Sequence, residues 1–325
     1  MTRVWTAWGF VAGDRLPSSA TNVSRDIRIE PVNSSRRQEL LRGVPRLEHP
    51  QLHFAAFYSA IAGEVVVRSD HAIWIRTRAP DFNEAWQRVE EQIPFIVAAL
   101  SKYSEAPPRV QLLRIAETQK TGAFSNVMTP WAPSGTFRGY PVHPLSEAEV
   151  TEVPSRYAVG RGRAEAACRL YYEATRQQDQ MDGTPRSFAN VVSTYFQVVE
   201  EVANRVLATY DLPVEQESDA RNLLESLRST LSSGRPLKKK LTALRATSLA
   251  VSRLEQRFLN QRVELAGADL GVDPACVVEA RRLADLRSTA LSHPGRPLPD
   301  DLSAHLNVAE RVARTYLNQW LDSLL

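Results

Sequence analysis

The sequence lacks several features that would assign a chemistry directly. Only 2 of the 325 residues are cysteines, Cys168 and Cys276, and they lie far apart. This scarcity excludes a cysteine-built zinc site and predicts a reducing, cytoplasmic environment. No glycine-rich phosphate loop, HExxH or GxSxG pattern is present. The chain therefore shows no sign of being a kinase, a metalloprotease or a serine hydrolase.

Long apolar runs and a strong charge bias are also absent. No stretch approaches ~18 uninterrupted apolar residues, so no membrane span is predicted. The first residues have one early positive charge and no small-residue cleavage site, so no signal peptide is expected. The net charge of +3 is weaker than the basic excess of dedicated duplex-DNA binders. Any contact with nucleic acid has to come from local clusters.

One histidine pair has a spacing that invites a metal interpretation. His49 and His53 are four positions apart, which would suit a metal ion if both lay on one helix. Pro50 and the strand-like residues around it argue against a helix there. No acidic or histidine partner follows at a recognisable distance, so we expect neither a metal ion nor another cofactor.

The length of the chain predicts two domains, because a single core rarely grows beyond ~250 residues. Residues 1–120 are expected to form a mixed α/β domain, since short segments alternate between apolar and polar residues. The predicted strands are Val4–Val11, Ser24–Val32, Glu64–Arg68, Ala72–Arg78 and 108–118. A helix is expected after Asp81, with Glu84 completing a capping arrangement and Pro94 introducing a kink.

Tryptophan is concentrated in this half of the chain. Five of the residues stand at positions 5, 8, 74, 86 and 131. Most are expected in the core, although an exposed pair would form a recognition surface. We therefore assign this domain a sensing or regulatory role, with a protein or small molecule as the trigger.

The second half has a different pattern. Residues 121–159 are rich in proline and glycine and are predicted to be an irregular connection. From 160 to 325 the apolar residues repeat at helical spacing. The predicted helices are 163–179, 186–211, 217–232, 236–249, 252–269, 274–292 and 300–323. Short connections between helices indicate antiparallel neighbours. The predicted fold class is α+β, a mixed α/β domain followed by an all-α helical bundle.

The segment with the most chemical content is residues 279–301, EARRLADLRSTALSHPGRPLPDD. Pro294 disfavours the helical conformation for His293, so the helix should end near Ser292 and let the imidazole turn toward Arg287. A histidine can transfer a proton near neutral pH, and a guanidinium can bind a phosphate with two parallel hydrogen bonds. Together they suit RNA cleavage by the 2′-hydroxyl, which needs no metal. One histidine cannot be both acid and base, so a dimer partner is expected to supply the second.

These residues resemble a known family. The stretch from Arg287 to His293 is similar to the Arg-x4-6-His motif of the HEPN (higher eukaryote and prokaryote nucleotide-binding) superfamily, near the end of a late helix in a bundle. An earlier helix, SFANVVSTYFQVVEEVANRV, has the aromatic and aliphatic run followed by Glu200 that is typical of this family. The order of domains resembles that of antiphage ApeA-like proteins and methylamine-utilisation accessory proteins. The resemblance, over residues 160–325, implies a dimer that cuts RNA without a metal in a defence or toxin setting.

The resemblance also assigns residues. Arg287 and His293 correspond directly to the catalytic pair, and Glu200 corresponds to a third catalytic residue, although Glu201 could equally match. Ser288 stands where other members often have Asn, Asp or His, and it is polar but cannot act as acid or base. The expected RNA contacts are Arg281, Arg282, Ser288, Arg296, Lys238 and Lys239.

The alternative is a non-catalytic module that binds a protein or a nucleotide, as many members of this superfamily do. In that case His293 would cap the end of its helix, where a cation is favourable. The basic residues would form solvated faces, and Glu200 would be an ordinary interhelical carboxylate.

Overall fold

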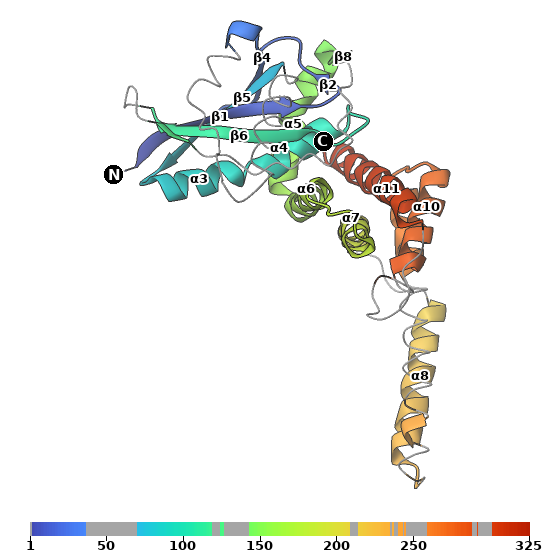
Figure 1. The fold of residues 1–325 in the computed structure, drawn as a ribbon. Coiled ribbons are helices and arrows are strands. Elements are labelled where there is room, and N and C mark those ends of the chain that lie inside the picture. Colours follow the sequence, from blue (N-terminus) through green and yellow to red (C-terminus); the bar gives the residue numbers. More distant parts are fainter. Residues whose placement is uncertain are drawn as a thin grey trace.

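The protein has an antiparallel sheet in its N-terminal part and is mostly helical in its C-terminal part (Figure 1). This computed structural model describes residues 2–36, 70–118, 124–126, 143–208, 214–234, 259–287 and 301–325, together with positions 236, 240–242, 244 and 291. The predicted α+β class is confirmed at this level, whereas the predicted domain boundaries stay predictions.

The main sheet has six strands in the order β3-β4-β5-β1-β6-β7, and every neighbouring pair is antiparallel. Its strands are β1 (Arg3–Ala12), β3 (Thr21–Ser24), β4 (Ile27–Pro31), β5 (His71–Ala79), β6 (Arg109–Glu117) and β7 (Phe124–Asn126). A separate parallel pair joins β2 (Arg15–Leu16) to β8 (His143–Pro144). One predicted strand, 64–68, lies outside the described residues.

Alternation along β5 places one face of the sheet on the core. Ile73 and Ile75 are fully buried, Trp74 is half-buried and Arg76 is exposed, as the period-2 pattern predicts. The predicted strand Ser24–Val32 is wrong in one respect, because a turn at Arg25–Asp26 separates β3 from β4. This turn contains no glycine, proline or asparagine, but Ser24 and Asp26 are common turn residues, and the Asp26 backbone N–H donates to the Ser24 hydroxyl.

Two short helices cover one face of the sheet (Figure 1). Helix α3 (Phe82–Glu90) begins where predicted, because the Asp81 carboxylate accepts a hydrogen bond from the Glu84 backbone N–H at 3.0 Å. The expected kink is a complete break, since a second helix, α4 (Ile93–Ser101), starts with Pro94 in its first turn. Every residue of α4 is buried, so this helix forms the centre of the core.

The predicted connection 121–159 contains a helix that sequence reasoning missed. Helix α5 (Glu147–Gly162) begins with a capping box, in which Ser146 and Glu149 satisfy each other's backbone N–H groups. Pro154 lies inside this helix, and it was one of the residues that suggested an irregular segment. The segment from 147 onward is therefore helical rather than irregular.

The remaining helices agree with the predicted pattern where the structure describes it; most of the predicted helix 236–249 lies outside the described residues, as do 252–258 and most of 288–292. These remaining helices are α6 (Glu165–Asp179), α7 (Pro185–Val206), α8 (Val214–Ser232), α10 (Pro274–Leu286) and α11 (Leu302–Ser323), and residues 259–269 are also helical. Helix α7 ends five residues before its predicted limit of 211. Helix α8 points away from the others (Figure 1). None of the described helices is long and apolar enough to cross a bilayer.

The buried core is continuous between the sheet and the helices. One hydrophobic cluster takes in Ile75 of the sheet, Leu100 of α4, Phe196 of α7 and Leu317 of α11. Trp8 and Trp74 pack against each other with ring centroids 6.0 Å apart, and both are half-buried. The sequence allowed for an exposed pair, and this pair is half-buried; a recognition role for it stays a prediction.

Candidate functional site

Two of the three residues predicted to act together, Glu200 and Arg287, meet where α7 packs against α10. The guanidinium of Arg287 forms an ion pair with the carboxylate of Glu200. Glu200 lies on α7, and Arg287 is the C-cap residue of α10. The two side chains come from elements far apart in the chain, so the fold itself brings them together.

Local sequence explains how each residue is positioned. Helix α7 starts at Thr184, whose hydroxyl accepts from the Ser187 backbone N–H, and Pro185 occupies its first turn. Phe196 is buried on the inner face of α7, and Glu200 follows one turn later on the same face. Helix α10 starts at Asp273, whose carboxylate caps the Ala275 backbone N–H.

Arg287 is held on two sides. Its guanidinium carbon lies 5.7 Å from the centre of the Phe196 ring, in a cation–π contact. The side chains of Arg287 and Glu200 are 25% and 21% exposed, so the pair is largely withdrawn from solvent but still reachable. An arginine presents five N–H donors. Its pairing with Glu200 therefore leaves donors for a second anionic group.

Burial changes the proton affinity of Glu200. Loss of solvent raises the pKa of the Glu200 carboxyl above its usual range, and the charges of Arg287 and Arg262 only partly oppose this. A carboxyl of this kind holds its proton more readily than an exposed glutamate. Perturbed carboxyls of this kind are common at functional sites, although structural ion pairs also produce them.

The structure distinguishes the two candidate glutamates. Glu201 pairs with Arg205 on its own helix at 2.8 Å, whereas Glu200 faces Arg287. Phe196 and Arg262 also lie near this pair. Phe196 belongs to the aromatic and aliphatic run that precedes Glu200, although its contact with Arg287 was not predicted. No sequence motif singled out Arg262, which only the packing of the helix at 259–269 could have identified.

The predicted RNA contacts have different positions. Arg281 is 47% exposed and pairs with Glu264 at 3.3 Å, on the helix at 259–269. Arg282 is exposed on α10 and has no ion pair among the residues that the structure describes. The other predicted site residues lie outside the described ranges: His293, Ser288, Arg296, Lys238 and Lys239. His49 and His53, the histidine pair with metal-like spacing, also lie outside them.

Among the described residues, no three His, Cys, Asp or Glu side chains cluster in a way that would hold a metal ion. The chemical content of the described site is therefore one guanidinium, one carboxyl with a raised pKa and an aromatic face. Such a site can bind an anion and hold it in a fixed orientation.

Comparison with known proteins adds no further assignment. No protein-family model matches the chain, and searches of curated proteins and of solved structures found no significant match. Any functional assignment therefore rests on the Arg287, His293 and Glu200 pattern and on the contact between α7 and α10.

Proposed function

We propose that the helical part of this protein is a metal-independent RNA endonuclease of the HEPN type that acts as a homodimer. Arg287 and His293 would be its catalytic residues, and Glu200 would be a positioning residue. The observation that carries this proposal is the ion pair between Glu200 and Arg287, which joins two of the three residues that the sequence pattern selected.

The chemistry follows from the properties of these groups. Arg287 would bind the phosphate to be cleaved and stabilise the additional negative charge of the transition state. His293 would take the proton from the 2′-hydroxyl, which then attacks the phosphorus and expels the 5′-oxygen. The histidine of the partner subunit would donate a proton to that oxygen. The products would be a 2′,3′-cyclic phosphate and a free 5′-hydroxyl.

Glu200 would act through Arg287. An arginine side chain has many rotamers, and fixing it before the substrate arrives reduces the entropy lost on binding. The carboxylate and the Phe196 ring restrain the guanidinium from two sides. We propose that RNA is the substrate, that the protein is a defence or toxin effector, and that the N-terminal part regulates it.

The test is RNA cleavage by the full chain. Purified wild type, His293→Ala and Arg287→Ala would be incubated with a mixed RNA pool in EDTA. We expect each variant to lose at least about a hundredfold in rate, the usual effect of removing a general base or a charge-stabilising donor. Arg311→Ala is the matched control, because Arg311 forms an exposed ion pair with Glu279 between α10 and α11. Equal cleavage by wild type and His293→Ala would refute the mechanism.

A second candidate function is a non-catalytic binding module. The observation that favours it is the partial burial of Arg287, which already has a carboxylate partner and an aromatic partner. Under this alternative Arg287→Ala would lower thermal stability and no preparation would cut RNA. Measuring the unfolding midpoint and the cleavage rate of the same samples separates the two functions.

A further inference from the structure

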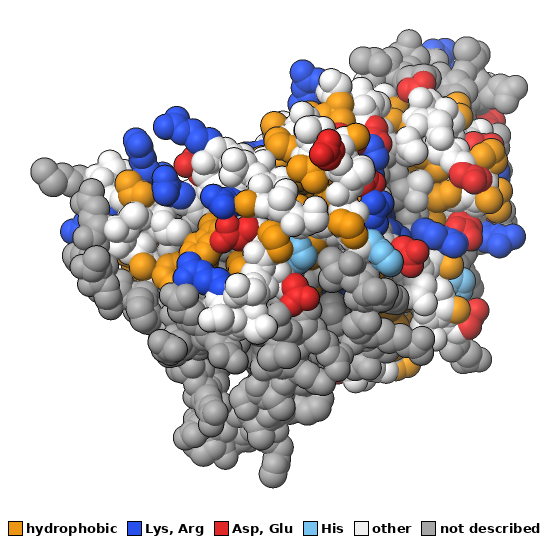
Figure 2. Space-filling model, turned by 90° about the horizontal axis from the view of Figure 1, so that it is seen from above, with side chains coloured by type: hydrophobic (Ala, Val, Ile, Leu, Met, Phe, Trp, Pro, Cys, Tyr) orange, Lys and Arg blue, Asp and Glu red, His pale blue; other side chains and the backbone are white. Residues whose placement is uncertain are grey.

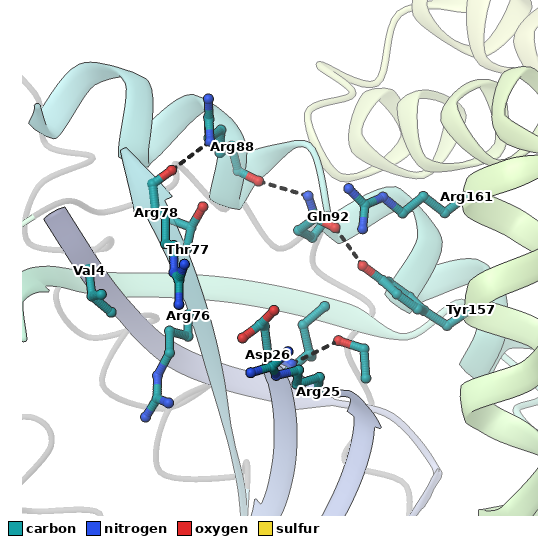
Figure 3. A pocket seen from close by; sticks show the side chains of 12 residues that line it. Val4, Arg25, Asp26, Arg76, Thr77, Arg78, Arg88, Gln92, Tyr157 and Arg161 are labelled. Carbon is teal, nitrogen blue, oxygen red and sulfur yellow. Dashed lines mark hydrogen bonds between the residues drawn. The ribbon is translucent and has the colours of Figure 1, made fainter. Parts of the chain in front are cut away.

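A cavity of about 440 Å³ lies between the sheet and α5, away from the α7–α10 contact (Figure 3). Four elements form most of its lining, namely the β3–β4 turn, strand β5, the junction of α3 and α4, and helix α5, and Val4 of β1 also lines it. Its size falls within the range of small-molecule sites, about 300 to 1,000 Å³. The cavity is distinct from the proposed ribonuclease site and the inference from it does not depend on that proposal.

The fold converges arginines on this cavity from distant parts of the chain. Strand β5 places Arg76 and Arg78 on one face, two residues apart. The turn that presents Arg25 is fixed to β5, because the Arg76 backbone N–H donates to the Asp26 carbonyl at 2.7 Å. From the opposite side, α5 contributes Arg161 (Figure 3).

The wall on the helical side is rigid. Tyr157 of α5 is 4% exposed, and its hydroxyl donates to Gln92 Oε1 at 2.5 Å. Gln92 in turn donates from its side-chain amide to the Arg88 carbonyl at 3.0 Å (Figure 3). This chain of hydrogen bonds links α5 to the α3–α4 junction, so the cavity is a built feature rather than a gap between loose side chains.

The charge in the cavity is strongly positive. Five of its lining residues are arginines and one, Asp26, is acidic. Arg88 is neutralised by Glu84 at 2.5 Å, which leaves four arginines against one aspartate, a local excess of +3. The whole chain also carries +3. Figure 2 shows one face of the molecule, on which several Lys and Arg side chains lie together at one end with few acidic side chains beside them.

Among the described residues, ion pairs do not neutralise the positive charge of three of these arginines. Arg25, Arg76 and Arg78 have no acidic partner within 4.0 Å among the residues that the structure describes. Like charges held close together repel each other, and a bound anion offsets that cost. The planar guanidinium fork matches a phosphate group, which accepts two parallel hydrogen bonds from one arginine.

An aromatic surface adjoins the arginines. A second hollow of about 330 Å³ shares Arg25, Asp26 and Arg76 with the first and is also lined by Trp74. Trp74 is half-buried, its ring packs beside Trp8, and the guanidinium carbon of Arg36 lies 5.6 Å from the ring centre. A nucleotide base that packs against this indole would take the place of the Arg36 guanidinium.

We propose that the arginine cavity binds a small compound with two or more phosphate charges. Arg25, Arg76, Arg78 and Arg161 would hold the phosphate groups, and an attached base would lie toward Trp74. Inorganic pyrophosphate and nucleoside diphosphates share this phosphate chemistry and differ in their use of Trp74. The enclosure by four elements favours a small molecule over an RNA strand.

The test is calorimetric titration of the full chain at about 0.15 M salt, where surface charges are screened over about 8 Å. The probes are inorganic pyrophosphate and adenosine 5′-diphosphate. Arg25→Gln and Arg76→Gln should each weaken binding of both probes at least tenfold, since a charge-assisted hydrogen bond contributes more than a neutral one. The control is Arg186→Gln, an exposed arginine at the start of α7 outside the cavity, which should bind like wild type.

The variants also identify the source of the phosphate. If Trp74→Leu weakens only adenosine diphosphate, the ligand is a nucleotide, and if it weakens neither probe, the phosphate groups alone are recognised. Circular dichroism of each variant confirms that it is folded. No binding of either probe at millimolar concentration would overturn the proposal. So would tighter binding of a short single-stranded RNA that depends on the same arginines.

Discussion

The junction between the sheet and the helices allows a quantitative prediction. Arg109 of β6 and Asp179 at the end of α6 form two contacts, Nε to Oδ2 at 2.6 Å and Nη2 to Oδ1 at 2.8 Å. Their side chains are only 13% and 10% exposed. Removing one partner of such a pair takes away the main counter-charge of the buried group that remains, which costs about 3–5 kcal/mol. We predict this loss of unfolding free energy for Arg109→Met, which keeps the length of the side chain.

The same loss can be expressed as a shift in the melting temperature. At about 2.1 cal/mol/K per residue, a cooperative unit of this length has an unfolding entropy of about 0.7 kcal/mol/K. A loss of 3–5 kcal/mol therefore lowers the midpoint by about 4–7 °C. Scanning calorimetry measures the midpoint, and urea unfolding gives the free energy. Because the core is continuous across the junction, we expect one transition.

The control is Arg3→Met. Arg3 pairs with Glu117 at 3.3 Å, but its side chain is 50% exposed, so we expect a loss below about 1 kcal/mol. The reasoning is refuted if Arg109→Met shifts the midpoint no more than Arg3→Met. Two separate transitions, of which the variant moves only one, would contradict the continuous core.

Three further predictions follow from burial. Gly9→Ala should destabilise the sheet by about 3 kcal/mol or more, because the added Cβ would lie 1.9 Å from a backbone oxygen. Gly162→Ala should be neutral or stabilising, because a Cβ at that position meets open space. Urea unfolding measures the free energy of unfolding of both variants. Burial raises the pKa of the Glu310 carboxyl, so its contribution to stability is full below the unfolded pKa and is lost as the pH rises through the folded pKa. Urea unfolding should therefore show that wild type loses stability relative to Glu310→Gln as the pH rises above 4.5, the ordinary glutamate value. Burial also raises the pKa of the Cys168 thiol to about 12, so iodoacetamide followed by mass spectrometry should find it unmodified in the folded protein and Cys276 modified first.

Each of these has an outcome that contradicts it. Equal stability of the two glycine variants would mean that the β1–β6 contact yields easily at that point. A constant difference between wild type and Glu310→Gln across the pH range would mean that burial does not control this carboxyl. Rapid labelling of Cys168 would show that the α5–α6 contact opens in the native state.

Local sequence patterns predicted those parts of the fold that depend on residues close together in the chain. The alternation of β5 and the Asp81 cap of α3 were both recognised, because they depend on neighbours in sequence. Helix α5 was missed because Pro154 and the prolines before Ser146 resemble helix breakers, although Ser146 and Glu149 have the spacing of a capping box, which marks a helix start. The break between α3 and α4 was underestimated, since a proline can either kink a helix or start the next one.

The candidate sites divide in the same way. A short motif selected Arg287, and a weaker helical pattern selected Glu200. Phe196 lies in that same helical pattern, but its contact with Arg287 comes from tertiary packing, and Arg262 belongs to no motif. The arginine cavity was not predicted at all, since its residues are scattered over strands, a turn and helices. Sequence patterns detect neighbours along a helix or a strand, and they do not register convergence from separate elements.

The central claim is that Arg287 and His293 cleave RNA by transesterification. The most direct measurement is the chemistry of the RNA ends formed in EDTA by wild type and by His293→Ala at equal concentration. The account predicts 2′,3′-cyclic phosphate and 5′-hydroxyl ends with wild type, and no cuts above background with the variant. Undiminished cleavage by His293→Ala, or 5′-phosphate ends that form only after Mg²⁺ is added, would contradict it.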